Sequence, residues 1–166
     1  KTSEEVEKFN RLTAPVRVYN KNRTLADEKL SEQFFIAKDL LDGLRKGEYK
    51  VSEVFDLDKL TSFVAISNLF GSQHGLTWGN IRVYYNPITN KLEPISFDAG
   101  SGKYLRKLVT YPFTENDSIF QEALMGKLSD FCHQSVVNTI INKYSKTLDS
   151  LYTALDQEFD FEYNPG

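Results

Sequence analysis

Three polar side chains near the middle of the chain have the chemistry to handle a metal-bound phosphate group. Asn80 and Asp98 carry amide and carboxylate oxygens, which a hard cation such as Mg²⁺ accepts as ligands. Mg²⁺ takes only one or two carboxylates from a protein and completes its shell with water and phosphate oxygens. His74 lies shortly before Asn80 and could accept a proton. The region is therefore a candidate site for a nucleotide that carries Mg²⁺.

A β-hairpin is the element expected to position the first two residues. Residues 81–85 are β-branched and aromatic, residues 92–97 form a second apolar-rich run, and the segment 86–91 between them is rich in turn-forming residues. We therefore expect an antiparallel pair of strands.

The register of this hairpin sets the distance between Asn80 and Asp98. If Tyr85 and Leu92 flank the turn, the pairing continues outward until Asn80 lies opposite Phe97, the neighbour of Asp98. Opposed residues have Cβ atoms roughly 5 Å apart. The two polar side chains are thus expected to be close enough to share one cation.

The same two residues also have a purely structural interpretation. Asparagine at the entrance of a strand and aspartate before Ala-Gly are common turn and cap residues, which hydrogen-bond nearby backbone. Spacing by itself does not separate this interpretation from a cation site.

The residues around the hairpin resemble the core of the CotH family, which contains spore-coat and other bacterial atypical protein kinases. The similarity covers about residues 53 to 102. It is carried by Leu60, Phe63, Ala65, Ile66, Leu69, Phe70 and Gly71, then His74-Gly75-Leu76-Thr77-Trp78-Gly79-Asn80, Tyr84-Tyr85-Asn86-Pro87, and Lys91-Leu92-Glu93-Pro94-Ile95-Ser96-Phe97-Asp98.

This resemblance implies a fold and an activity. The expected fold class is α+β and mostly α-helical: the helical C-terminal lobe of an atypical protein-kinase-like fold, with one β-hairpin that carries the site. By the same resemblance, Asn80 and Asp98 bind metal and hold Mg²⁺ with ATP, and phosphate passes to a serine or threonine of a protein. The analogy also implies a bacterial envelope, extracellular or spore-surface setting.

One position departs from the family pattern. Family kinases place an aspartate a few residues before the asparagine, whereas residues 74–78 contain no carboxylate. Phosphoryl transfer needs a group in this loop to orient the acceptor hydroxyl and accept its proton, and His74 is the candidate for that role. The structural alternative is that His74 simply hydrogen-bonds backbone, as a lone histidine in such a loop more often does.

The missing carboxylate leads to a second possible function, and the two metal ligands allow a third. The chain could be a pseudokinase or a cell-surface binding module that keeps the scaffold without the chemistry. A metal-dependent hydrolase that uses the same two ligands is a further class, although the sequence offers no second acidic cluster for it.

The start of the chain suggests a hinge. Residues 15–19 alternate like an edge strand, and residues 1–23 as a whole could link to an upstream lobe. The sequence contains neither a glycine-rich loop between strands nor a Val-Ala-x-Lys strand, which kinases use to cover the nucleotide. We therefore expect the isolated chain to be inactive.

Helices are expected on both sides of the hairpin. The first is predicted to be capped by Asp27 and to stop at Gly47, and the second to be capped by Asp56 or Asp58 and to be buried nearly all round. Asn116-Asp117-Ser118 should begin a third helix that stops near Gly126, and Ser129 or Asp130 should begin a fourth.

The glycine-rich segment after Asp98 is not a phosphate loop. A Walker A motif needs glycine where Phe97 stands and serine or threonine where Tyr104 stands. The segment instead resembles a kinase activation segment, and the cations Lys103, Arg106 and Lys107 could steer an anionic substrate.

Composition excludes several classes of protein. A chain of 166 residues with 40% hydrophobic and 26% charged side chains can form one globular domain, here residues 1–166. A net charge of −3 gives no footprint for nucleic acid, and no apolar run approaches the roughly 20 residues of a membrane span. The single Cys132 excludes an internal disulfide.

Overall fold

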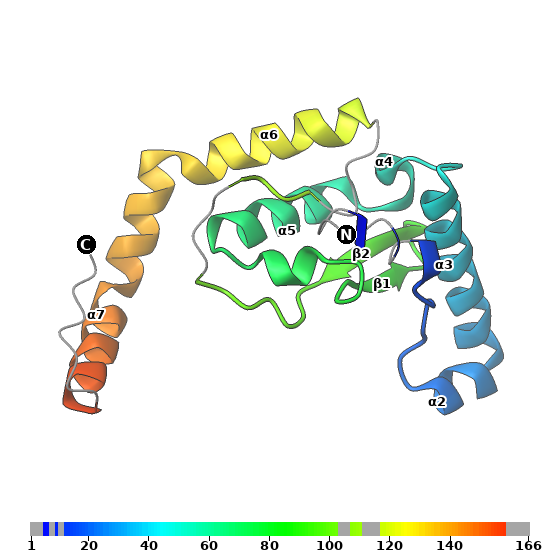
Figure 1. Cartoon of the computed structure of the whole chain (residues 1–166), viewed down its shortest axis with the longest axis horizontal. Coiled ribbons are helices and arrows are strands. Elements are labelled where there is room, and N and C mark those ends of the chain that lie inside the picture. Colours follow the sequence, from blue (N-terminus) through cyan, green and yellow to red (C-terminus); the bar gives the residue numbers. More distant parts are fainter. Residues whose placement is uncertain (1–4, 7–8, 10–11, 103–106, 111–116, 159–166) are drawn as a thin grey trace. The chain divides into compact units, whose positions relative to one another are not determined.

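The computed structural model describes residues 5–6, 9, 12–102, 107–110 and 117–158. The chain divides into two compact units, Lys1–Lys127 and Leu128–Gly166, and each is described by itself. Labels follow Figure 1. The elements in chain order are α2 (Lys21–Ala26), α3 (Glu28–Lys46), α4 (Val51–Val54), α5 (Leu57–Leu69), the 3-10 helix η1 (Gln73–Leu76), β1 (Arg82–Asn86), β2 (Lys91–Ile95), α6 (Ser118–Cys132) and α7 (Gln134–Glu158).

The predicted α+β class, mostly helical with one antiparallel hairpin, is confirmed. Strands β1 and β2 pair in the predicted register, with Tyr85 opposite Leu92 and Arg82 opposite Ile95. None of the helices in the described part of the chain combines the length and the apolar character needed to cross a membrane.

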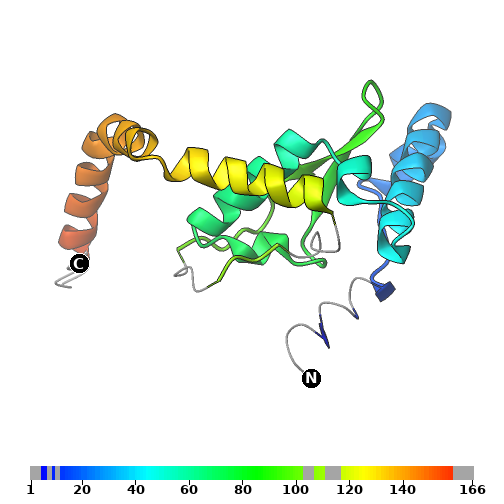
Figure 2. The same cartoon turned by 90° about the horizontal axis from the view of Figure 1, so that it is seen from above.

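The core of the first unit lies where α5 packs against β2 and η1. Figures 1 and 2 both show the hairpin beside α5, with α3 next to it. Most of the buried apolar side chains come from α4, α5, η1, β2 and the first part of α6, joined by Leu41 of α3 and by Phe55 and Trp78 between elements. The largest of those that are fully buried are Phe55, Phe120, Leu60, Leu76, Leu92, Val54 and Val64.

Polar contacts fasten the hairpin to α5. Lys59 Nζ in α5 lies 2.7 Å from Glu93 Oε2 in β2, and the Asn86 amide donates to Glu93 Oε1 at 2.8 Å. The hydrogen bond from Lys59 and then that from Asn86 lower the pKa of Glu93, while the contact with Glu93 raises the pKa of Lys59. The hairpin is thus fixed to the helix by charge as well as by burial.

Local capping signals were predicted correctly for the first two long helices. The carboxylate of Asp27 accepts from Leu30 N at 2.9 Å, and that of Asp56 accepts from Lys59 N at 3.1 Å. Gly47 ends α3 in the left-handed conformation, with φ of 75°. The burial of α5 is less complete than predicted, since Ile66 is 46% exposed.

Several predicted boundaries were wrong. Residues 15–18 form no strand, and helix α2 begins at Lys21, within the segment 1–23 that was expected to be a hinge. Helix α6 continues through Gly126 and Ser129 to Cys132, because one glycine costs a helix only about 1 kcal/mol and flanking helical turns outweigh it. The break comes at His133, whose Nδ1 accepts from Ser135 N at 3.4 Å.

The side chain of Asp117 accepts hydrogen bonds from the first turns of both α4 and α6. It is only 2% exposed, and its carboxylate accepts from Ser52 N at 2.8 Å and from Phe120 N at 3.1 Å. Burial alone would raise its pKa, but the hydrogen bonds from Ser52 and from the first turn of α6 outweigh burial and lower it. This carboxylate therefore stabilises the fold in its charged form.

Acid should remove that stabilisation. Because the folded pKa lies below the unfolded one, the contribution of Asp117 is complete above the ordinary carboxyl pKa of about 3.9 and is lost as pH falls through the folded value. Asp117→Asn should lower the free energy of unfolding by about 1–3 kcal/mol near pH 7 and flatten its acid dependence, measured by urea denaturation at a series of pH values. Asp130→Asn, at an exposed site in the same helix, is the control and should leave the pH profile unchanged.

Two helical glycines should respond oppositely to alanine. A Cβ on Gly43 would lie 2.3 Å from ring atoms of Tyr49, whereas a Cβ on Gly126 would meet no atom within 4 Å. Gly43→Ala should destabilise the fold by about 1–2 kcal/mol because the ring must move. Gly126→Ala should stabilise it by about 0.5–1 kcal/mol through helix propensity. Thermal denaturation followed by circular dichroism measures both, and a stabilised Gly43→Ala variant would contradict this packing.

Candidate functional site

His74 is presented by a tightly packed 3-10 turn. Within η1, Gly75 and Leu76 are buried, while the His74 side chain is 48% exposed. A Cβ on Gly75 would lie 3.4 Å from the Phe97 carbonyl oxygen and 3.6 Å from Ala99 Cα. These are ordinary van der Waals distances, so η1 lies directly against the segment that follows β2, and this contact brings His74 to the end of the hairpin.

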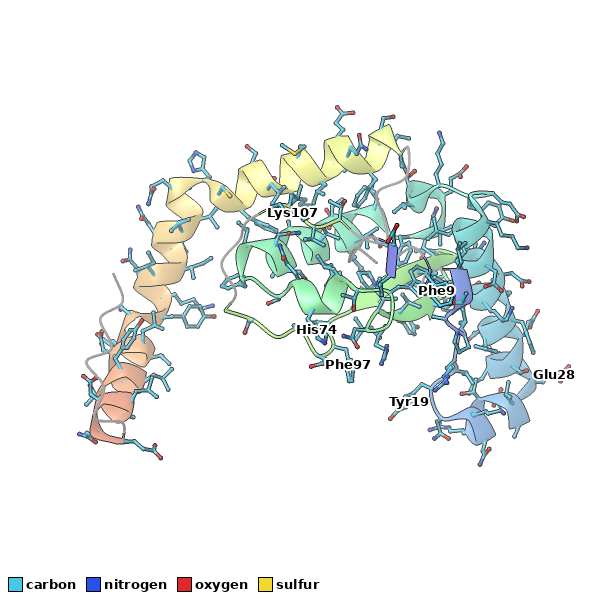
Figure 3. The ribbon with its side chains drawn as sticks, viewed as in Figure 1. Phe9, Tyr19, Glu28, His74, Phe97 and Lys107 are labelled. Atoms are coloured by element: carbon cyan, nitrogen blue, oxygen red, sulfur yellow. The ribbon has the colours of Figure 1, made fainter. Side chains whose placement is uncertain are left out.

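The structure places all three predicted site residues together. Asn80 Nδ2 lies 2.8 Å from His74 Nε2, and Asp98 Oδ2 lies 3.4 Å from the same nitrogen. Figure 3 shows His74 and Phe97, the neighbour of Asp98, at this end of the hairpin. The imidazole thus lies between the amide and the carboxylate that the hairpin register predicted to be neighbours.

Backbone conformation helps to aim the carboxylate. Asp98 has φ of 45°, in the left-handed region, and Gly100 follows with φ of 59°. Few residues other than glycine adopt such backbone angles, although aspartate and asparagine do so more readily than most. Non-glycine residues in this conformation cluster at functional sites, where the surrounding structure imposes the strain.

The hydrogen bonds define how the three groups interact. The amide nitrogen of Asn80 also lies 3.4 Å from the His74 carbonyl oxygen, so the NH₂ group faces both acceptors. In the neutral imidazole, Nε2 then accepts from Asn80 and Nδ1 carries the proton. In the charged imidazole, Nε2 carries a proton that can be donated to Asp98.

The oxygen atoms of Asp98 and Asn80, and not the nitrogen of His74, are the atoms that suit a hard divalent cation. Asp98 offers a carboxylate that is 60% exposed, and Asn80 offers an amide oxygen once the amide is turned over. Turning the amide breaks its hydrogen bond to His74, so a cation and the imidazole compete for Asn80. Among the described residues, no three His, Cys, Asp or Glu side chains gather closely enough to hold a metal ion between them.

Asn68 anchors the chain on both sides of the site, and sequence analysis missed it. This residue is fully buried in α5, and its amide donates to the carbonyls of Val64 at 2.8 Å and Val109 at 2.9 Å. Its oxygen accepts from Val109 N and from the Gln73 side chain. The sequence signal was a lone amide on the apolar surface of a helix, which has to find partners when it is buried.

The cations predicted to flank Asp98 are only partly described. Lys103 and Arg106 lie outside the described residues. Lys107 lies apart from His74 and Phe97 in Figure 3, and its carbonyl accepts from Gln73 Nε2 at 3.0 Å. Beside the acidic turn, the guanidinium of Arg82 lies 4.5 Å from the centre of the Phe97 ring.

Trp78 belongs to the core. It is 7% exposed, and the guanidinium of Arg45 lies 5.0 Å from the centre of its ring. Arg45, in the last turn of α3, also donates to the Ala14 carbonyl. The guanidinium of Arg45 therefore packs over the ring of Trp78.

No protein-family model, no curated protein and no solved structure matches this chain.

The geometry predicts the tautomer of His74. Because the Asn80 amide donates to Nε2, the neutral ring should carry its proton on Nδ1, and Asn80→Ala should raise the population of the Nε2–H form. Nitrogen-15 chemical shifts of the imidazole, measured at a pH where the ring is neutral, report both forms. His133 is an internal reference, since its Nδ1 contacts Ser135 and should not respond. An unchanged His74 spectrum in Asn80→Ala would show that this hydrogen bond is absent.

Proposed function

We propose that this chain is the helical lobe of a CotH-like atypical protein kinase, which transfers phosphate from Mg²⁺-bound ATP to serine or threonine of a protein. The observation that supports this is the convergence of Asn80 and Asp98 on His74, at 2.8 and 3.4 Å. In phosphoryl transfer, catalysis is mostly positioning and charge stabilisation, and an amide, a carboxylate and a proton acceptor in contact supply the groups required.

Each side chain has a distinct role in this proposal. Asp98, exposed and anionic, is the main ligand of the cation, and Asn80 is the second ligand through its amide oxygen. The bound Mg²⁺ would offset the charge that develops on the phosphate oxygens. With its amide oxygen turned toward a cation, Asn80 would no longer donate to Nε2 of His74, and this nitrogen could accept the proton of the acceptor hydroxyl, in place of the aspartate that the CotH pattern has in this loop.

A second candidate is a pseudokinase that binds the nucleotide, or a partner, without transferring phosphate. The observation that favours it is the engagement of the imidazole, because Nε2 already accepts from Asn80 and lies beside Asp98. While Nε2 of His74 accepts a hydrogen bond from Asn80, its lone pair is occupied, and it is a poor proton acceptor unless the Asn80 amide moves. The two candidates therefore differ in whether ligand binding frees His74.

Two substitutions separate the candidates in the complete protein that carries this sequence. Asp98→Asn should weaken Mg²⁺–ATP binding about tenfold or more, since it removes the charged ligand, and should abolish phosphate transfer. His74→Gln should retain binding but reduce the transfer rate roughly 10²- to 10⁴-fold, the range of general-base catalysis. Titration calorimetry measures binding, and transfer of radioactive phosphate from ATP to a serine-containing protein measures activity.

The control is Glu122→Gln, which removes an exposed carboxylate on α6 and should change neither quantity. Binding without transfer in the unmodified protein would select the pseudokinase. Full activity in Asp98→Asn would refute the assignment of the cation site, and absence of both binding and transfer in the unmodified protein would refute both candidates.

A further inference from the structure

Arg45 is a largely buried cation at a place where a solvated one would suffice. It lies beside Lys46 in the last turn of α3, where a positive charge complements the helix dipole. The side chain of Lys46 is 66% exposed and can fill that role, whereas that of Arg45 is only 12% exposed. Taking a guanidinium out of water costs free energy that its contacts must offset. The helix dipole therefore does not account for the burial of Arg45.

The guanidinium of Arg45 joins three parts of the first unit. Its Nη1 lies 3.2 Å from Asp42 Oδ1, one turn earlier in α3, and its Nη2 donates to the carbonyl oxygen of Ala14, in the segment ahead of α2. Its Cζ lies 5.0 Å from the centre of the Trp78 ring. A planar fork of donors whose face stacks on aromatic rings can make all three contacts together, which the compact ammonium of a lysine cannot.

Trp78 is the buried side chain of the turn that connects His74 to Asn80. Thr77 N donates to the His74 carbonyl at 3.2 Å. The Thr77 carbonyl in turn accepts from the N–H groups of Asn80 and Ile81, at 3.0 and 3.1 Å. Because these hydrogen bonds make one continuous turn of the backbone, the position of the indole ring determines how the turn presents Asn80.

We propose that Arg45 is a positioning residue of the candidate site, which fixes the ring of Trp78 and thereby holds Asn80 where its amide donates to His74. Asn80 follows Trp78 by two residues, and its Nδ2 lies 2.8 Å from His74 Nε2. Arg45 acts on the site through the tryptophan. Its effect on Mg²⁺–ATP rests on the proposed function, whereas its effect on the imidazole follows from this geometry alone.

The alternative role for Arg45 is only to stabilise the packing of α3 against β1. A purely stabilising contact changes the fraction of folded molecules and leaves the folded site as it was. A positioning contact changes the site within the folded molecules. The imidazole of His74 reports the difference, because its tautomer depends on the hydrogen bond from Asn80.

Nitrogen-15 chemical shifts of His74 in the folded protein, at a pH where the ring is neutral, test the proposal. Arg45→Met keeps an apolar stem without the guanidinium, and it should shift His74 toward the Nε2–H form, in the direction of Asn80→Ala. Arg45→Lys keeps the charge without the fork and should give a smaller shift in the same direction, which also decides the test if Arg45→Met does not fold. The fluorescence of Trp78, the single tryptophan, should move to longer wavelength in the same order as its ring becomes hydrated.

Two control variants separate positioning from stability. Arg23→Met makes the same substitution at an exposed site in α2 and should leave His74 and Trp78 unchanged. Asp117→Asn should destabilise the fold through its contacts with α4 and α6, and the His74 spectrum of its folded molecules should stay the same. An equal shift of His74 in either control would overturn the proposal, and so would an unchanged His74 in both Arg45 variants.

Nucleotide binding in the complete protein that carries this sequence provides the second measurement. Arg45→Met should weaken Mg²⁺–ATP binding roughly three- to tenfold, the equivalent of one lost cation–π contact, and Arg23→Met should leave binding unchanged. If the unmodified protein binds no Mg²⁺–ATP but His74 still shifts in the Arg45 variants, the proposed function fails and the positioning role stands. If Mg²⁺–ATP binds equally well to Arg45→Met and the spectrum of His74 is unaltered, the positioning role fails and the proposed function stands.

Discussion

The attachment of strand β2 to the start of helix α5 is the constraint on which the site depends. Leu92 is fully buried, pairs with Phe55 as an isolated parallel bridge, and accepts from Asp56 N through its carbonyl at 2.9 Å. Asp56 also caps α5. Phe55 and Asp56 therefore hold strand β2 against the first turn of α5. The register of the hairpin then determines the positions of Asn80 and Asp98 at its end.

The opposite end of α5 is held by Asn68. Its buried amide ties the segment around Val109 and the side chain of Gln73 to the helix, and Gly102 N donates to the Phe70 carbonyl at 3.0 Å. A buried amide with all its partners stabilises one arrangement, whereas an unpaired one is costly. The turn that carries His74 lies between Asn68 and Leu92 in the sequence, so a buried residue holds the chain on each side of it.

The two units are stabilised by different means. The first unit has a core of fully buried side chains and the buried carboxylate of Asp117, which joins α4 to α6. In the second unit, α7 has no buried residue and a continuous apolar stripe. The first unit thus has a buried core of its own, whereas α7 buries none of its residues.

Local sequence determined the features that depend on neighbours in the chain: the alternating strands and their register, the caps at Asp27 and Asp56, and the stop at Gly47. It failed at Pro15, where the described residues provide no strand for pairing, and at Gly126, where the helix continues. Only the tertiary structure decided that Asn80 donates to His74 beside Asp98 and that Asn68 holds the surrounding segments. Periodicity and capping act within a few residues, whereas these contacts join distant parts of the chain that approach one another only after α5, η1 and the hairpin have packed.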